Sequence, residues 1–378
     1  MMKLRLITCL LLINFGLSDC ANHNPPSPVI SNNPDSILTA PSNNGIQSIG
    51  LLLPLQGPLA NIGLSVKQGF LAAADESRSA PRIIFIDTCL ESDMQAAYNE
   101  ALVKKVQIIV GPLLKPQVQN IASLQTHIPI LALNYLNPDI STPPQLVQFG
   151  LSPVDEAQQA TQLAWQRGKR SALIITANGN WGTHLGETFA QQWQALGGTV
   201  VDTLSLSENL SDITKQMRHF LHFKPPHNKR TDFDVIFLAT NSRIGRQVKP
   251  LLKFFYAGDV PVYATASIYS GASSPRFDKD LNQVIFCAAP WSLANNRIEP
   301  NLYQQLKSSF PIRFNQNRKY YALGIDAFHI IQQLERLNQS PQQTLQGATG
   351  TLSLNNQHRI VRQLSCAQFC NGYLIPID

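Results

Sequence analysis

Unbroken apolar runs that alternate with helical patterns constrain the fold of this chain more than any other feature of its sequence. The first series begins with "IGLLLPL" at 49–55 and continues with runs at 82–88, 106–114 and 128–134, separated by helical patterns that end near 77, 105 and 125. Strands that read as continuous apolar runs belong to parallel sheets that helices cover on both faces. The alternation therefore predicts a doubly wound, mostly parallel α/β layer.

The same construction restarts near residue 151, and this repetition predicts two lobes. Apolar runs lie at 171–176, 199–206, 234–240, 260–266 and 282–290, with helical patterns at 154–167, 183–196 and 242–255. Two further helical patterns, at about 302–310 and 320–337, precede a strand-rich end whose Asn-Gly dipeptides suit tight turns. A chain of 378 residues with 44% hydrophobic residues can bury a core in each lobe.

The composition argues against several classes of function. Charged residues make up only 14% of the chain, against about 25% in ordinary domains, and the formal net charge is +6. The Lys and Arg residues are scattered along the sequence without an aromatic-basic motif, so we expect solvated faces and no nucleic-acid partner. No GxSxG, HExxH or GxxxxGK[ST] motif occurs. We therefore predict a protein that is not an enzyme and that uses no cofactor.

The N-terminus has the features of a secretory leader. Lys3 and Arg5 precede an apolar run at 6–17, and Cys20 follows shortly after it. A basic start, a short apolar core and a small-residue exit are typical of a secretory signal, and the run is shorter than the roughly 20 residues that span a bilayer. The position of Cys20 resembles the lipobox of bacterial lipoproteins, although Asp19 stands where a small residue is usual. An ordinary leader is the alternative.

We assign 1–20 to a signal that ends at the lipidated Cys20, and 21–45 to a flexible tether. Residues 21–45 are dominated by Asn, Pro and Ser and cannot bury enough apolar surface to offset the entropy of ordering. Such a tether would have an r.m.s. span of about 25–30 Å. Under the usual sorting rule for bacterial lipoproteins, Ala21 after the Cys implies the outer membrane.

Five segments together resemble a known family: "IGLLLPLQGPLANIGLSVKQGF", "IVGPLLKPQV", "VKPLLKFFYAGDVPVYATASIYSG", "YALGIDAF" and "GATGTLSL". They are similar to the LppC/LpoA family of outer-membrane lipoproteins, over 46 to the C-terminus, with 248–271 as the most specific block. The resemblance implies a protein on the periplasmic face of the outer membrane that binds and activates a class A penicillin-binding protein, which is a peptidoglycan synthase. It also implies a two-lobed α/β fold like that of type I periplasmic binding proteins, with three crossovers between the lobes.

Carried over to this sequence, the family's domain places lobe 1 at 46–150 and 293–362, and lobe 2 at 151–292 and 363–378. Members from enteric bacteria carry a helical repeat domain before this one, whereas here we expect only the signal and the tether before residue 46. The alternative function is a periplasmic small-molecule binding protein that takes a cell-wall fragment or a nutrient.

Ligands of open α/β sheets bind beyond the carboxyl ends of the strands, and this rule predicts a cleft between the lobes. The residues expected there are Gln56, Gly57, Leu113, Leu114, Asn134, Tyr135, Asn178, Trp181, Tyr269, Ser270 and Trp291. Amino-acid receptors of this fold place Ser or Thr hydroxyls where this chain has Leu113-Leu114 and Asn134-Tyr135. We therefore expect poor binding of amino acids, whereas the amides and rings could suit a sugar or muropeptide. The alternative is that Trp181 and Trp291 pack the hinge.

Four cysteines follow Cys20 in the sequence. Cys366 and Cys370 share one short segment, and in an extended segment their Cα atoms would lie about 13 Å apart, beyond the roughly 7 Å that a disulfide spans. Cys287 and Cys366 fall near the hinge segments and are the one pair that we consider for a disulfide. We expect Cys89 to be a free, largely buried thiol, and we expect no metal site.

Replacing Cys20 tests the anchor. Because a lipidated Cys20 would be the attachment to the bilayer, Cys20→Ala should move the protein from the membrane fraction to the soluble fraction of the cell envelope. Fractionation followed by immunoblotting measures this, with Cys89→Ala as the control that leaves the lipobox intact. An unchanged distribution of Cys20→Ala would mean that another element holds the protein at the membrane.

Overall fold

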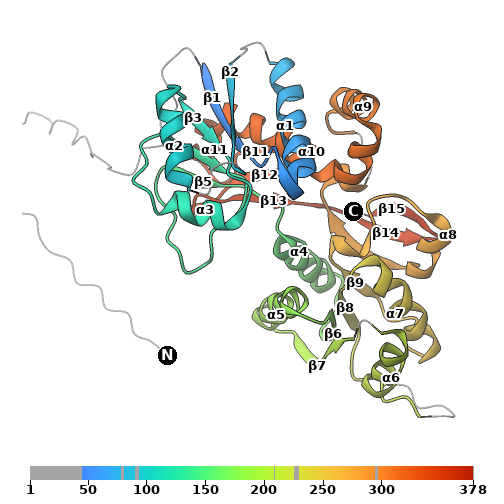
Figure 1. The fold of residues 1–378 in the computed structure, drawn as a ribbon. Helices are drawn as coiled ribbons and strands as arrows, with labels where there is room; N and C mark the ends of the chain where they lie inside the picture. Colours follow the sequence, from blue (N-terminus) through green and yellow to red (C-terminus); the bar gives the residue numbers. More distant parts are fainter. Residues whose placement is uncertain are drawn as a thin grey trace, which may run out of the picture. The chain divides into compact units, whose positions relative to one another are not determined.

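Two mostly parallel sheets, each flanked by helices, organise the part of the chain that the structure describes (Figure 1). The structure is a computed structural model that describes residues 45–77, 81–89, 93–207, 209–224, 230–293 and 297–377. The predicted signal, Cys20 and all but the last residue of the predicted tether lie outside these ranges. Within them, no helix is both long enough and apolar enough to cross a membrane.

The first sheet has five parallel strands in the order β2-β1-β3-β4-β5. Its strands are β1 (Ser48–Leu53), β2 (Arg82–Asp87), β3 (Ile108–Val110), β4 (Ile130–Ala132) and β5 (Leu146–Gln148). The helices between them are α1 (Ala60–Asp75), which follows the short 3₁₀ turn η1 (Gly57–Leu59), α2 (Met94–Val103) and α3 (Lys115–Ala122). Every residue of β1 is buried, as expected for a central strand covered on both faces.

The second sheet has seven strands in the order β15-β14-β10-β9-β8-β6-β7. Its parallel strands are β6 (Ser171–Ala177), β7 (Thr199–Leu206), β8 (Val235–Ala239), β9 (Val262–Ala264) and β10 (Val284–Ala288). Its helices are α4 (Pro153–Gln166), α5 (Asn180–Ala195), α6 (Leu210–Phe220), α7 (Ser242–Phe254) and the short α8 (Pro275–Asp278). The 3₁₀ turns η2 (Ala266–Ile268) and η3 (Lys279–Leu281) lie between β9 and β10.

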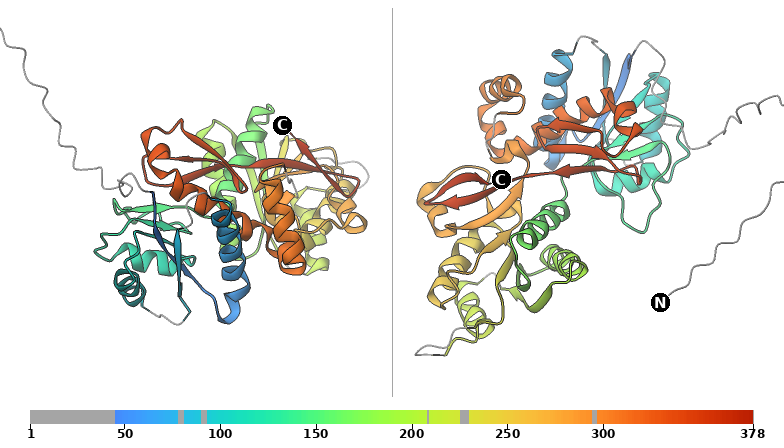
Figure 2. Two further views of the ribbon diagram at one scale, coloured as in Figure 1. Left: turned by 90° about the horizontal axis from the view of Figure 1, so that it is seen from above. Right: turned by 180° about the vertical axis from the view of Figure 1, so that it is seen from behind.

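The chain returns to the first lobe after β10 and then crosses back once more. The 3₁₀ turn η4 (Pro290–Leu293) leads to α9 (Pro300–Ser309), α10 (Pro311–Gln332) and α11 (Leu334–Gln339). A three-stranded antiparallel sheet follows, with β11 (Thr344–Gly347), β12 (Gly350–Leu354) and β13 (Ile360–Gln363). β13 runs on into β14 (Ser365–Cys370), which pairs antiparallel with β10 and with β15 (Tyr373–Ile377) in the second sheet (Figure 2).

Helix α10 closes the first lobe by packing closely on α1, although these two segments lie far apart in the sequence (Figure 1). The close approach requires glycine, because a Cβ atom on Gly324 would lie 2.1 Å from the carbonyl oxygen of Val66. The sequence predicted a helix at 320–337, which is correct in type but wrong in its bounds. The true helix begins at Pro311 and changes direction at Asn317, where the backbone leaves helical geometry.

A disulfide joins Cys287 of β10 to Cys366 of β14, which face each other in the antiparallel register. This pairing confirms the one disulfide considered from the sequence. Cys89 is free, as predicted, but its predicted burial is wrong. It lies just beyond the end of β2, where its exposed thiol donates to the carbonyl of Gln56 at 3.0 Å.

Trp291 anchors the second crossover in the core of the first lobe. Its side chain is fully buried, and its ring makes edge contacts with Tyr303 at 5.1 Å and Phe314 at 5.9 Å between ring centroids. Its indole Nε1 donates a hydrogen bond to the carbonyl of Ile298 at 2.9 Å. Both the apolar body and the polar atom of this side chain are therefore satisfied within one lobe.

Trp291→Ala should lower the free energy of unfolding by about 3–5 kcal/mol, because it empties a fully enclosed aromatic site. The matched control is Trp181→Ala, since Trp181 is 42% exposed and its removal should cost less than about 1 kcal/mol. Urea unfolding of both variants, followed by far-UV circular dichroism, makes the comparison. Equal losses in the two variants would contradict the different packing of the two rings.

Candidate functional site

A cavity of about 310 Å³ lies between the lobes, beyond the carboxyl ends of β9 and β10. Lobe 2 contributes residues that follow these strands, and α10 contributes a polar edge from lobe 1. The side chains that matter chemically are Trp181, Tyr269, Ser270, Asn315, Arg318, Lys319, Glu156 and Arg362. With Phe286 of β10, the cavity therefore joins three aromatic rings to polar groups among which three basic side chains face one acid.

The basic groups of the cavity are held in place by the surrounding backbone. Arg318 is mostly buried and donates a hydrogen bond to the carbonyl of Gly271, which ties α10 to the loop after η2. Lys319 follows it on the same helix and lines the cavity too. The opposing acid is Glu156 of α4, whose carboxylate accepts a hydrogen bond from the amide of Ala266 at 2.9 Å.

Glu156 has an unusual protonation equilibrium. Burial raises the pKa of its carboxyl group from 4.5 to about 7, although the Ala266 amide and the positive charges of Arg362 and Lys319 act in the opposite direction. Near neutral pH this group is therefore partly protonated. When it is neutral, the basic side chains of the cavity lose an opposing charge, so the cavity suits an anionic or a hydroxyl-rich ligand.

A second polar network fixes α4 to the third crossover. Asp155 accepts hydrogen bonds from Arg359 at 3.0 Å and from the buried Arg362 at 2.9 Å. The Arg359 guanidinium also stacks over the ring of Tyr135, with 3.7 Å between its central carbon and the ring centroid. The Tyr135 hydroxyl donates to the carbonyl of Gly150 at 3.0 Å, and burial raises its pKa. Tyr135 therefore serves the hinge.

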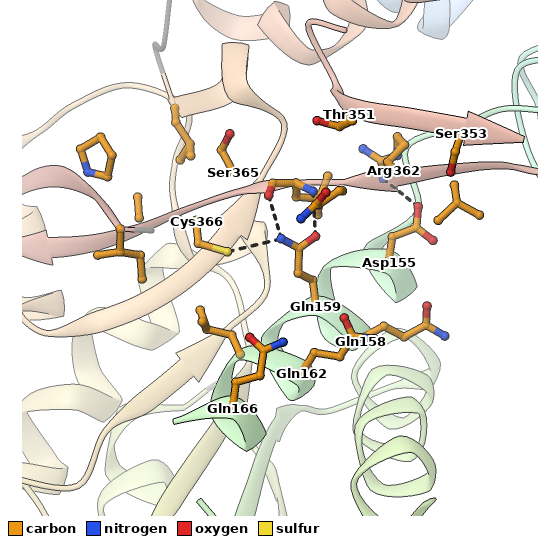
Figure 3. A pocket seen from close by; sticks show the side chains of 18 of the residues that line it. Asp155, Gln158, Gln159, Gln162, Gln166, Thr351, Ser353, Arg362, Ser365 and Cys366 are labelled. Atoms are coloured by element: carbon orange, nitrogen blue, oxygen red, sulfur yellow. Dashed lines mark hydrogen bonds and ion pairs between the residues drawn. The ribbon is translucent and has the colours of Figure 1, made fainter. Parts of the chain in front are cut away.

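A larger groove of about 830 Å³ runs between α4 and the segment from β12 to β15 (Figure 3). Gln158, Gln162 and Gln166 project from α4 on this side. The side-chain amide of Gln159 makes two hydrogen bonds with Leu364 of the third crossover. Its nitrogen donates to the Leu364 carbonyl and its oxygen accepts from the Leu364 backbone N–H, each at 2.7 Å. The groove is rich in amides and hydroxyls, and none of its described lining residues is aromatic.

The structure brings three of the predicted cleft residues together at the 310 Å³ cavity: Trp181, Tyr269 and Ser270. The others do not line it. Those others are Gln56, Gly57, Leu113, Leu114, Asn134, Tyr135, Asn178 and Trp291. Trp291 is enclosed in the core of the first lobe. The side-chain amide of Asn134 donates a hydrogen bond to the carbonyl of Leu113 at 2.9 Å. Gln56, Gly57 and Asn178 are exposed at turns outside the cavity.

Four charged residues of the cavity were not predicted from the sequence: Glu156, Arg318, Lys319 and Arg362. Arg318 and Lys319 precede the helix start that the pattern indicated, and Arg362 alternates with exposed neighbours on β13. The only sequence pattern that could have indicated Glu156 is a carboxylate near the start of a helix, followed by apolar residues at helical spacing. It does not distinguish a cavity carboxylate from a solvated one.

Comparison of the sequence with known proteins identifies the family of this chain. The model of the family described as "LppC putative lipoprotein" matches residues 16–372. The chain belongs to the LppC lipoprotein family. It is 30% identical over 341 residues to the penicillin-binding protein activator LpoA of Haemophilus influenzae, in a match that covers 88% of this chain and 55% of that protein. The chain thus spans about half the length of this curated relative.

Solved structures agree with the assignment to the LppC family. The C-domain of Haemophilus influenzae LpoA, described as a regulator of PBP1A, has a TM-score of 0.74 and 27% identity, with 88% of this chain and 100% of that chain covered. A solute-binding protein of an ABC transporter from R. palustris, in complex with 4-hydroxybenzoate, has a TM-score of 0.58 and 16% identity, with 88% and 95% of the two chains covered. The second likeness shows the fold alone, namely the two-lobed periplasmic binding protein architecture that the sequence predicted.

Glu156→Gln should change how stability depends on pH. The folded-state pKa of Glu156, about 7, is raised above its ordinary value of 4.5, so the protonated group contributes stability fully below pH 4.5 and loses this contribution as the pH rises through 7. The neutral amide has no such loss. The variant should therefore unfold nearly like the unaltered protein at pH 4.5 and be more stable by about 3 kcal/mol at pH 8.

Urea unfolding at several pH values tests this expectation. The control is Glu187→Gln, which changes an exposed carboxylate on α5. Parallel pH profiles for the unaltered protein and Glu156→Gln would contradict the raised pKa.

Proposed function

We propose that this chain is a lipid-anchored protein at the periplasmic face of the outer membrane that binds and activates a class A penicillin-binding protein. The observation that carries the proposal is the match to the whole length of the LpoA C-domain, a protein described as a regulator of PBP1A. The fold alone would not support it, because solute-binding proteins share that fold.

The position of the anchor fits the same proposal. The family is one of lipoproteins, and the matched range 16–372 includes Cys20. The residue after this cysteine, Ala21, is the one that implies the outer membrane under the usual sorting rule. A tether of about 25 residues would give the folded lobes a limited reach toward the inner membrane.

The ties at the hinge support a binding role that does not depend on lobe closure. Asp155 and Gln159 hold α4 to the third crossover, and the Cys287–Cys366 disulfide joins the strands beside the second and third crossovers. A ligand shifts an equilibrium between open and closed lobes only through its differential affinity for the two states. Ties that hold in one arrangement reduce what a small ligand can gain from closure.

The alternative, a receptor for a small polar molecule, rests on the 310 Å³ cavity with its basic groups and three aromatic rings. Its volume is at the lower end of typical ligand pockets. A cell-wall fragment that carries carboxylates and hydroxyls would match this lining.

The decisive experiment measures synthesis of peptidoglycan from lipid-linked precursor by purified class A penicillin-binding proteins of the same cell. Addition of the full mature chain in detergent should raise the rate of glycan polymerisation or of peptide crosslinking. A solute-binding protein of the same fold, added at equal concentration, is the control and should leave the rate unchanged. Absence of stimulation together with absence of binding would overturn the proposal. Thermal shifts with muropeptides in parallel would then show whether the receptor alternative replaces it.

A further inference from the structure

Two neighbouring helices of lobe 2, α6 and α7, end in an exposed group of aromatic rings. We call Phe223, Phe254, Phe255 and Tyr256 the terminal aromatic cluster. Phe254 is 68% exposed and Tyr256 is 48% exposed. The ring of Phe223 lies 6.3 Å from Phe254 and 5.7 Å from Tyr256 between centroids. Phe223, Phe254 and Tyr256 therefore form one continuous surface and are not isolated exposed side chains.

The backbone holds these rings in a fixed arrangement. Phe255 is buried in the core of lobe 2 and contacts Phe223 at 5.0 Å between centroids. Tyr256 follows α7 with φ of 64°, the left-handed conformation in which glycine is usual after a helix. The buried Lys249 secures the next turn by donating to the carbonyl of Gly258 at 3.0 Å. A large ring thus stands where glycine would fit with less strain.

The two helices that end in the terminal aromatic cluster are rich in basic residues. The segments 210–224 and 242–260 contain seven Lys and Arg residues and only two Asp residues, namely Lys215, Arg218, Lys224, Arg243, Arg246, Lys249, Lys253, Asp212 and Asp259. Among them, Arg218, Lys224 and Lys253 are exposed, and the Arg218 guanidinium lies 5.9 Å from the Phe223 ring centroid. The basic residues that look scattered in the sequence are therefore partly gathered by the fold, because α6 packs against α7.

The arrangement of the two helices favours a protein partner over a lipid surface. A helix that lies on a bilayer presents an apolar face along its length. Here α6 and α7 bury those faces in the lobe 2 core, through Met217 and Val248 among others, and only their ends expose rings. Protein interfaces are enriched in Phe, Tyr and Arg, and a few such residues carry most of the binding energy.

We propose that the terminal aromatic cluster and the basic residues of its two helices are the surface on which this protein binds an acidic, ring-accepting face of its partner, and this inference rests on the proposed function with a peptidoglycan synthase. In a parallel α/β layer, helices end at the amino ends of the strands, whereas the cavity lies at the carboxyl ends. The surface and the cavity are therefore at opposite edges of the second sheet, and α6 lies at the far end of lobe 2 (Figure 1). Partner binding leaves the cavity open to a ligand.

The test measures binding of the full mature chain to the immobilised synthase at low and at physiological salt. The double variant Phe254→Ala/Tyr256→Ala should bind at least tenfold more weakly, because it removes the exposed rings. The double charge reversal Arg218→Glu/Lys253→Glu should slow association and weaken its salt dependence. The control Phe277→Ala removes another ring of lobe 2 that is 54% exposed but lies outside the cluster, and it should bind normally. Thermal melting confirms that each variant is folded.

The outcomes separate this surface from the proposed function. If the unaltered protein binds and the double variant Phe254→Ala/Tyr256→Ala binds equally well, the surface is wrong and the function stands. If the unaltered protein does not bind the synthase, the proposed function fails and this surface with it. A third arm uses vesicles of phosphatidylethanolamine with phosphatidylglycerol. Vesicle binding that depends on Phe254 and Tyr256, with synthase binding unchanged, would overturn the surface in favour of a membrane contact.

Discussion

The ion pairs of Asp155 with Arg359 and Arg362 are the interaction on which the arrangement of the two lobes depends. Asp155 lies in the first turn of α4, at the start of lobe 2, whereas both arginines come from the last strand region of lobe 1. The side chain of Arg362 is only 2% exposed, so its charge has little water to stabilise it. Loss of one partner from such a pair costs about 3–5 kcal/mol, because the other charge remains buried. The position of α4 against β13 follows from this constraint.

Both hollows of the hinge region are consequences of that position. Glu156 follows Asp155 on α4, so the tie at Asp155 also sets Glu156 against the amide of Ala266 in the cavity. One turn later, Gln159 reaches Leu364 and forms one wall of the polar groove. Arg362 lines both the cavity and the groove, and among the described residues its Nε atom has no hydrogen-bond partner.

The sequence predicted the layers of the fold well, because continuous apolar strands leave little choice of partner. β1 and β8 are buried at every position and were found from their apolar runs. Helix α6 was left out of the predicted series because a Ser-Asp-rich start and basic residues hide its apolar face, of which Ile213, Met217 and Phe220 are the buried positions. The predicted helix was shorter than α10, because the first turns of α10 carry Arg, Asn and Gln, and a loop would fit these residues equally well.

The candidate site was harder to predict, since it depends on contacts between segments far apart in the sequence. Trp291 and Tyr135 follow strands, as cleft residues should, yet one ring enters the core and the other supports an arginine pair. Whether a side chain after a strand turns toward a cleft or back into its own lobe depends on what packs beside it. Here α9 and α10, which come later in the chain, provide the partners Tyr303 and Phe314 that enclose Trp291.

A low content of charge gives the remaining charged groups more influence over recognition. With only 14% charged residues and a net charge of +6, local clusters dominate the field around the chain. Two such clusters border lobe 2. Arg318 and Lys319 of α10, a helix of lobe 1, face its cavity, and Arg218 and Lys253 lie at its far edge. The far-edge groups are exposed, so salt screens them and they act mainly on the rate and orientation of encounter. At the cavity, Arg318 is mostly buried whereas Lys319 is exposed, and the effect of this pair on a ligand varies with the protonation of Glu156 between about pH 6 and 8. The same kind of charge can therefore orient a large partner at one edge of lobe 2 and select a small ligand at the other.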